Sequence, residues 1–181
     1  MKHLDDGLYY HQSHVRTSRI AGFDLGKTLV VTITGKTAVS DDDWTFLPNR
    51  LPVLKALQDD GYTIVIFTNQ TLKFHRSDSK TKVKMKLMNL RRKNQIIKTL
   101  ECYGINPWVF ASTDDNRYRK PLPGMWKIFN NVFDHPIDLT RSFFVGDSAG
   151  RITDKSSNDL FFAEIVGLDF YLPDDFFQGE A

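Results

Sequence analysis

The segment that most constrains the fold of this chain is Tyr62–Phe67, which reads Tyr-Thr-Ile-Val-Ile-Phe. Its residues are mostly apolar and β-branched, and they lack the alternation of polar and apolar side chains that marks a strand with one face in water. A run of this kind is typical of a strand that is covered on both faces, as strands of a parallel sheet are. We therefore expect a sheet whose two faces are both buried.

Strand and helix patterns alternate along the rest of the chain. Strands are predicted at residues 19–25, 29–34, 108–112 and 142–147, and helices at 51–60, over the stretch that ends near 100, at 125–133 and at 159–166. Such alternation favours an α/β domain in which helices cover both faces of a mostly parallel sheet. The 181 residues are enough for one domain of this kind, which we place at residues 19–181.

Composition is that of an ordinary globular protein, with 41% hydrophobic and 25% charged residues. A net charge of +2 says little about partners, and no run approaches the ~18 apolar residues of a membrane span. The single cysteine, Cys102, allows no internal disulfide and favours a reducing, intracellular location. Residues 1–18 are polar and lack the apolar run of a signal peptide, so we expect them to form an exposed N-terminal arm.

One loop of the sequence fits two kinds of phosphate chemistry. Ala21, Gly26, Lys27 and Thr28 form a relaxed version of the glycine-rich loop that cradles nucleoside triphosphates. That loop needs a strand before Ala21 and a helix that opens at Gly26, so that helix-terminal amides face the phosphates. Here polar residues precede Ala21, and a β-branched run unsuited to a helix follows Thr28. A nucleoside triphosphatase is therefore the minor alternative.

The second interpretation uses polar residues near the ends of predicted strands: Asp24, Thr68 with Asn69, Lys120 and Asp147. In an open α/β sheet, ligands bind at the carboxyl ends of the strands. A carboxylate nucleophile, a group that orients phosphate, a lysine and a second carboxylate for Mg²⁺ suit phosphoryl transfer through an aspartyl-phosphate. Each residue alone has a simpler explanation, such as a helix cap or a solvated turn, but the whole set favours a phosphate site.

The segments that carry these residues resemble the four motifs of haloacid dehalogenase-type phosphatases. They are Phe23-Asp-Leu-x-x-Thr-Leu29, Phe67-Thr-Asn-Gln70, Arg119-Lys-Pro121 and Gly146-Asp147. Over roughly residues 19–177 the chain is similar to the phosphatase domain of polynucleotide kinase 3′-phosphatase; further matching segments are Asp43-Trp44, Arg119-Lys-Pro-x-x-Gly-Met-Trp126, Phe144-Val-Gly-Asp-Ser-Ala-Gly-Arg151, Asp154-Lys-Ser-Ser-Asn-Asp159 and Pro173-Asp-Asp-Phe-Phe177. The resemblance implies a Rossmann-like three-layer sandwich, with a mostly parallel sheet and no cap domain.

The resemblance also implies a reaction and roles for individual residues. The reaction is Mg²⁺-dependent removal of 3′-phosphates from nucleic-acid ends, with DNA favoured over RNA. Asp24 would be the nucleophile and a metal ligand, Asp147 a second metal ligand, and Gly26 would offer its backbone carbonyl to the metal. The residues implied to hold the phosphate and balance its charge are Thr68, Asn69 and Lys120.

The first motif departs from the family pattern at two adjacent positions. The family reads Asp-x-Asp-Gly-Thr, whereas this chain has Gly26 in place of the second Asp and Lys27 in place of the Gly. The missing acid would protonate the leaving oxygen and then activate water, and losing such help costs about 10²–10⁴-fold in rate. Lys27 also strains the loop if that position has positive φ. We therefore expect weak or absent turnover, and the alternative is a pseudo-phosphatase that serves as a binding module or assembles with a partner protein.

A basic cluster follows the predicted Thr68 loop. Residues 73–93 contain nine Lys or Arg and one acidic residue. Such a cluster would neutralise phosphates along a nucleic-acid backbone, although a solvated helix face is the ordinary explanation for a charge run. The residues that we predict to contact nucleic acid are Lys73, Arg76, Lys80, Lys82, Lys84 and Lys86.

Overall fold

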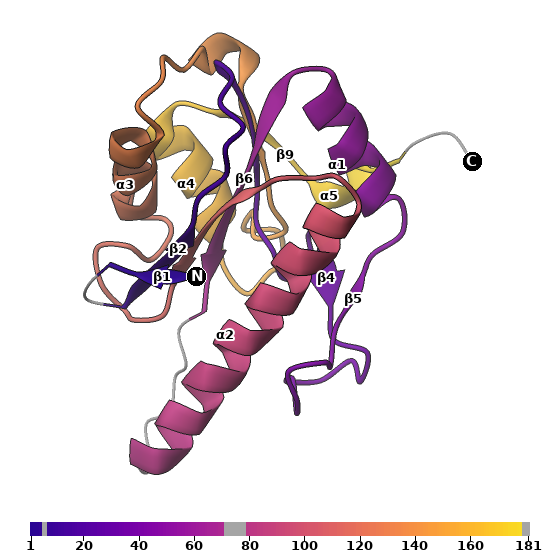
Figure 1. Cartoon of the computed structure of the whole chain (residues 1–181), viewed down its shortest axis with the longest axis vertical. Coiled ribbons are helices and arrows are strands. Elements are labelled where there is room, and N and C mark those ends of the chain that lie inside the picture. The colour runs from indigo at the N-terminus through magenta and orange to yellow at the C-terminus, as the bar shows by residue number, and fades with distance from the viewer. Residues whose placement is uncertain (5–6, 71–78, 179–181) are drawn as a thin grey trace.

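The computed structural model describes residues 1–4, 7–70 and 79–178, and it contains a central sheet with helices on both faces (Figure 1). The sheet has seven strands in the order β1-β2-β7-β6-β3-β8-β9. Their bounds are Lys2–His3 (β1), Leu8–His11 (β2), Arg19–Phe23 (β3), Tyr62–Asn69 (β6), Trp108–Ser112 (β7), Phe143–Val145 (β8) and Asp169–Tyr171 (β9). All neighbouring strands from β7 to β9 pair in parallel, whereas β1 and β2 are antiparallel additions at one edge. The predicted α/β class with a mostly parallel sheet is confirmed.

The helices form the two outer layers of a three-layer sandwich. Helices α1 and α2 supply core residues to one face of the sheet, and α3 and α4 supply them to the other. The helix bounds are Arg50–Asp59 (α1), Ser79–Cys102 (α2), Gly124–Phe133 (α3), Asn158–Val166 (α4) and Pro173–Phe176 (α5). No separate cap domain occurs in the part of the chain described above.

The apolar run in strand β6 is continuous because both faces of this strand are buried. Successive side chains of a strand point to opposite faces of the sheet, so Val65 and Phe67 lie in the core beneath α3 and α4. Ile64 and Ile66 lie in the core beneath α1 and α2. All four side chains are buried because both faces are covered.

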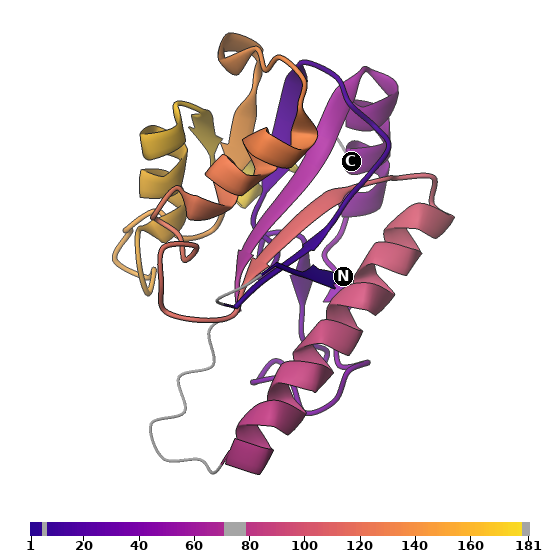
Figure 2. The same ribbon diagram turned by 60° about the vertical axis from the view of Figure 1, so that its left-hand side comes forward.

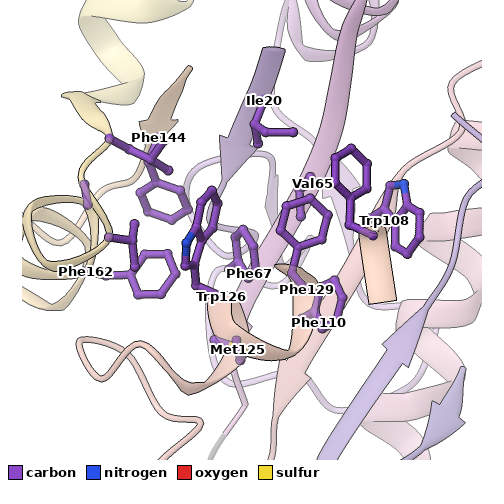
Figure 3. Packing of buried hydrophobic residues seen from close by; sticks show 14 of the residues in the cluster. Ile20, Val65, Phe67, Trp108, Phe110, Met125, Trp126, Phe129, Phe144 and Phe162 are labelled. Carbon is purple, nitrogen blue, oxygen red and sulfur yellow. The ribbon is translucent and has the colours of Figure 1, made fainter. Parts of the chain in front are cut away.

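The core beneath α3 and α4 is built largely from aromatic rings (Figure 3). Phe67 lies among them, with its ring centroid 5.3 Å from that of Phe162 and 5.6 Å from that of Phe110. Phe129 meets it edge-on at 5.8 Å. These separations are those that aromatic pairs prefer, so this ring connects side chains from the sheet and from both helices.

Residues 1–18 do not form the exposed arm that we expected. Leu8 is fully buried, and β2 pairs with β7, so that Leu8 lies opposite Ser112 and His11 opposite Val109. Residues 1–18 contain only three scattered aliphatic residues, Leu4, Leu8 and Val15, and the strand that β2 pairs with lies about a hundred residues away in the sequence. Its place in the sheet is therefore set by the free edge of β7 rather than by a local pattern.

The predicted strand at 29–34 is shorter than expected. Only Val30–Val31 (β4) is a strand, and it pairs with Thr45–Phe46 (β5) in a hairpin outside the main sheet. Residues 27–29 form a turn that leads into β4, and no helix begins at Lys27. The nucleoside triphosphate loop is thus excluded, because its phosphate-facing helix terminus does not exist here.

None of the helices in the described ranges combines the length and the apolar character needed to cross a bilayer.

Candidate active site

Three carboxylates meet at the carboxyl edge of the parallel strands. Asp24 directly follows β3, and its backbone N–H donates to the carbonyl of Val145 at the end of β8, at 2.9 Å. This bond places Asp24 next to Asp147, which lies just beyond β8. Asp159, in the first turn of α4, completes the group, and one oxygen from each carboxylate lies within 4.8 Å of the others.

Lys120 provides the positive charge of the site. Its side chain is 2% exposed, and its Nζ lies 2.8 Å from Oδ1 of Asp24 and 2.6 Å from Oδ1 of Asp159. Asn69 fixes the backbone of this lysine: its Nδ2 donates to the Lys120 carbonyl at 3.0 Å, and its Oδ1 accepts from the Lys120 N–H at 2.9 Å. Asn69 therefore holds Lys120, a contact that its expected role with phosphate did not include.

Thr68 precedes Asn69 at the end of β6 and is also buried. Its Oγ1 accepts a hydrogen bond from Nε2 of Gln70 at 2.7 Å. Thr68 and Gln70 line a pocket of about 230 Å³, and Asp24, Gly26 and Lys120 line it as well. The pocket is polar and large enough for a phosphate group.

Asp159 is a site residue that the sequence analysis did not assign. It lies in a segment that resembles the family, but an acid in the first turn of a helix is ordinarily explained by the helix dipole. Its second oxygen accepts from the Ser148 N–H at 3.0 Å. A Cβ at residue 146 would lie 2.5 Å from the Cβ of Asp159, so Gly146 allows α4 to approach the strand end. This close packing brings Asp159 to Lys120.

Burial dominates the ionisation of these groups. Loss of water raises the pKa of Asp24 to about 7, opposed by Lys120 and reinforced by Asp159. Burial and the charge of Asp159 also raise the pKa of Asp147. Burial alone would lower the pKa of Lys120, but its two carboxylate partners outweigh that effect and raise the pKa above its usual value. Three carboxylates thus share one buried ammonium, which leaves an excess of negative charge.

The donor set fits a hard divalent cation such as Mg²⁺, which prefers carboxylate, carbonyl and water oxygens. Asp24 and Asp147 would hold it, and the backbone carbonyl of Gly26 is available at the same loop. Asp159 is already engaged by Lys120 and Ser148, so it would balance the lysine rather than bind the metal first.

Comparison with known proteins gives the chain a family. Residues 19–177 match the family model described as polynucleotide kinase 3 phosphatase. The chain belongs to this family. The range that matches the polynucleotide kinase 3 phosphatase family includes all the site residues discussed above.

Relatives in this family differ in length. The bifunctional polynucleotide phosphatase/kinase of Schizosaccharomyces pombe is 36% identical over 92% of this chain, which spans 39% of that protein. The polynucleotide 3′-phosphatase ZDP of Arabidopsis thaliana is 33% identical over 96% of this chain, which spans 25% of that protein. An uncharacterized 20.8 kDa protein of Autographa californica nuclear polyhedrosis virus is 36% identical, and the match covers 94% of this chain and 93% of the viral protein.

Solved structures agree with the fold. The D,D-heptose 1,7-bisphosphate phosphatase of B. bronchiseptica, determined with magnesium and phosphate, superposes with a TM-score of 0.61 at 23% identity, over 85% of this chain and 79% of that chain. A protein of Mesorhizobium loti, described as resembling haloacid dehalogenase phosphatases, gives a TM-score of 0.61 at 20% identity, over 91% of this chain and 78% of that chain. These likenesses support the haloacid dehalogenase-like architecture.

The structure defines the conformation of the two residues, Gly26 and Lys27, that depart from the family's first motif. Lys27 has φ 61°, which is the left-handed region that favours glycine. Gly26 is exposed, and a Cβ built there meets no atom within 4 Å. The loop could therefore accommodate the family's aspartate at residue 26, while the lysine at residue 27 is strained.

Two sets of contacts fix the loops of the site from outside the pocket. Arg151 donates from Nη2 to the carbonyl of Asp147 at 3.0 Å, and the carboxylate of Asp154 holds the same guanidinium at 2.9 Å. On the other side, Nε of Arg50 donates to the carbonyl of Thr28 at 3.0 Å, and its guanidinium lies 4.2 Å from the centre of the Phe177 ring.

The residues predicted to contact nucleic acid are spread over different surfaces. Lys73 and Arg76 lie outside the described residues. Lys80 and Lys84 line a shallow pocket with Val83 and Leu87. They lie in the N-terminal part of α2, and none of these four residues lines the pockets near the site, to which α2 contributes Met88, Arg92 and Ile96.

The remaining two predicted contacts also differ from each other. Lys82 is exposed, whereas Nζ of Lys86 lies 3.7 Å from a carboxylate oxygen of Asp114. A backbone role for Lys80, Lys82, Lys84 and Lys86 stays a prediction.

Proposed function

We propose that this chain, together with Mg²⁺, binds polynucleotide ends that carry a 3′-phosphate and removes that phosphate slowly. The observation that carries the proposal is the buried ion-pair system in which Lys120 joins Asp24 to Asp159, with Asp147 in reach of both carboxylates. The substrate class comes from the relatives, because the Schizosaccharomyces and Arabidopsis proteins are named for acting on polynucleotides.

The reaction uses Asp24 as the nucleophile. Its carboxylate oxygen forms a bond to phosphorus, the bond from phosphorus to the sugar 3′-oxygen breaks, and an aspartyl-phosphate results. Water then attacks phosphorus, releases inorganic phosphate and frees Asp24. Lys120 stabilises the ionised form of Asp24 and the negative charge of the phosphate, and Thr68 orients the phosphate oxygens. Asp24 and Asp147 would hold Mg²⁺, which would supply further positive charge to the site.

The proton for the departing sugar oxygen limits the rate. A sugar alkoxide is a poor leaving group, and Gly26 has no side chain to protonate it. The same absence affects the second step, in which water needs a base. A loss of general acid–base help corresponds to about 10²–10⁴-fold in rate, so binding survives better than turnover.

The test is to restore the family sequence at the loop. The variant Gly26→Asp with Lys27→Gly places a carboxylate in open space and removes the positive-φ lysine. We expect near-background phosphate release from a 3′-phosphorylated oligonucleotide by the natural protein with Mg²⁺, and release that is faster by about 100-fold or more in the double variant.

Two controls accompany this test. Adding Asp24→Asn to the double variant should abolish release, and a 5′-phosphorylated oligonucleotide should not be hydrolysed. Rapid release by the natural protein would show that the missing acid does not limit the reaction.

A second candidate function is that of a binding module without turnover. It is favoured by the paired change at residues 26 and 27, which removes the acid and adds a cation while the ion pairs of the site stay intact. Such a module would retain a 3′-phosphorylated end or serve in assembly with a partner protein. A well-folded double variant that binds the oligonucleotide but stays inactive would support this function.

A further inference from the structure

A second pocket lies beside the phosphate pocket. It has a volume of about 480 Å³ and lies between the loop after Asp24, the β4–β5 hairpin and helix α2. The hairpin runs beside α2 in both ribbon views (Figure 2). Pockets of about 300–1,000 Å³ are those that hold small molecules, and a single nucleotide falls within this size.

The lining combines positive charge with an apolar wall. Its charged side chains are all basic: Lys27, Lys36, Arg92 and Lys155. Its apolar side chains include Val30, Val31, Trp44 and Ile96. No carboxylate faces the pocket among the lining residues. The chemistry therefore suits a ligand that has an anionic group on one side and a flat or apolar group on the other.

The walls of this pocket are held in place by partly buried hydrogen bonds. The carboxylate of Asp43 accepts hydrogen bonds from the N–H and the hydroxyl of Thr34, at 3.0 and 2.8 Å, and so fixes the hairpin loop. Nε1 of Trp44 donates to Oε1 of Gln95 at 3.0 Å and joins the hairpin to α2. A wall that is fixed before binding loses little entropy when a ligand enters.

The two pockets are adjacent, because Gly26 and Gln70 line both of them, so one ligand can extend from one pocket into the other. Lys27 lies at this junction, where its charge lowers the pKa of Asp147 against the effect of burial. The family pattern has glycine at this position, so the ammonium group is a departure from that pattern.

We propose that this basic pocket binds the remainder of the 3′-terminal nucleotide, while the 3′-phosphate lies against Asp24 and Lys120. The nucleoside packs on the apolar wall that includes Trp44, and the phosphate on its 5′ side is bound by the basic residues. The inference rests on the proposed function and deepens it, because it confines most of the recognition to one nucleotide that carries a phosphate on each side.

Binding of two small ligands by the full chain tests the proposal. Thymidine 3′,5′-bisphosphate and thymidine 3′-monophosphate are titrated by calorimetry in the presence of Mg²⁺. We expect the bisphosphate to bind about tenfold more tightly or better, since charge-assisted hydrogen bonds to phosphate are strong. We also expect the preference to decline as salt is added.

Substitutions in the basic pocket test whether its side chains bind the phosphate on the 5′ side of the nucleotide. Lys36→Gln with Lys155→Gln changes two exposed side chains, and it should remove most of the preference while the affinity for the 3′-monophosphate stays unchanged. Arg92→Gln should act in the same direction. The matched control, Lys80→Gln with Lys84→Gln, removes two charges from the N-terminal part of α2, which does not line the basic pocket, and should keep the preference.

The outcomes separate this inference from the proposed function. Equal affinities for the two ligands in the natural protein, or equal losses in the control variant, would overturn the pocket assignment while 3′-monophosphate binding still supports the site at Asp24. Failure of both ligands to bind would overturn both proposals.

Discussion

At the scale of single residues, a substitution at Asp154 tests how firmly Asp147, the proposed metal ligand, must be held. We expect Asp154→Asn to weaken Mg²⁺ binding about 10-fold to 100-fold, the usual effect of removing support behind a metal ligand. The hydrogen bond from Arg151 lowers the pKa of Asp154 to about 2, so the pair stays charged near neutral pH. Calorimetric titration with Mg²⁺ measures the change.

The control for this variant is Asp169→Asn, which removes an exposed carboxylate in β9 and should leave Mg²⁺ affinity unchanged. Native affinity in Asp154→Asn would mean that the loop holds Asp147 without the help of Arg151.

Single residues also show how far the sequence could predict the site. Asp24, Lys120 and Asp147 could be grouped because parallel strands end at one edge of a sheet. Asp159 could not, because its place depends on where α4 begins and on how closely Gly146 lets that helix approach. The contact between Asn69 and the backbone of Lys120 likewise depends on a loop path that no residue pattern specifies.

At the scale of elements, helix α2 contains a lysine whose charged form is destabilised by burial. Lys93 is 2% exposed, and its Nζ donates to the carbonyl of Asn89 at 3.2 Å. Burial, with repulsion from Arg92, lowers its pKa well below the usual value. The unfolded chain therefore binds this proton more tightly than the folded protein does, so stability rises as pH rises from the folded pKa toward about 10.4.

We expect Lys93→Met to raise the free energy of unfolding by about 1–2 kcal/mol at neutral pH. The gain should be smaller near pH ~10, because the folded lysine is then neutral and the lysine of the unfolded chain begins to lose its proton. Urea unfolding at both pH values measures this. Lys98→Met, an exposed change in the same helix, is the control and should show no such pH dependence. A loss of stability on Lys93→Met would mean that the ammonium has a stabilising role.

Elements with a strong local pattern were predicted well, and those defined by distant pairing were not. The expected strand at 108–112 coincides with β7, and the expected helix at 125–133 differs from α3 by one residue. Strand β2 was not predicted, and β4 was predicted too long. The hydrogen-bond partners of these strands, β7 and β5, lie elsewhere in the chain. Strand pairing of this kind leaves little trace in a short segment.

At the scale of the whole molecule, stability depends on the aromatic core that joins the sheet to α3 and α4. We expect Phe67→Ala to lower the free energy of unfolding by about 3–5 kcal/mol, because the cavity left among the surrounding rings cannot collapse fully. Chemical denaturation measures the loss. Phe161→Ala, which truncates a 48% exposed ring in α4, should cost far less.

The layered α/β architecture followed from the alternation of strand and helix patterns, but the order of the strands did not. Position in the sheet is decided by which strand edges remain open after the central strands have paired, and that is a property of the assembled fold.

For the core substitutions, comparable losses of unfolding free energy in Phe67→Ala and Phe161→Ala would show that the core depends less on the Phe67 ring than its packing indicates.

Arg50 connects the turn after Asp24 to the residue that follows α5. Its guanidinium donates to the Thr28 carbonyl and also covers the Phe177 ring, so one side chain contacts both segments. A four-residue helix opens locally at a lower free energy than a central sheet does. Gentle warming should therefore loosen the turn after Asp24 while the sheet persists, and the protein would lose its affinity for phosphate before it melts.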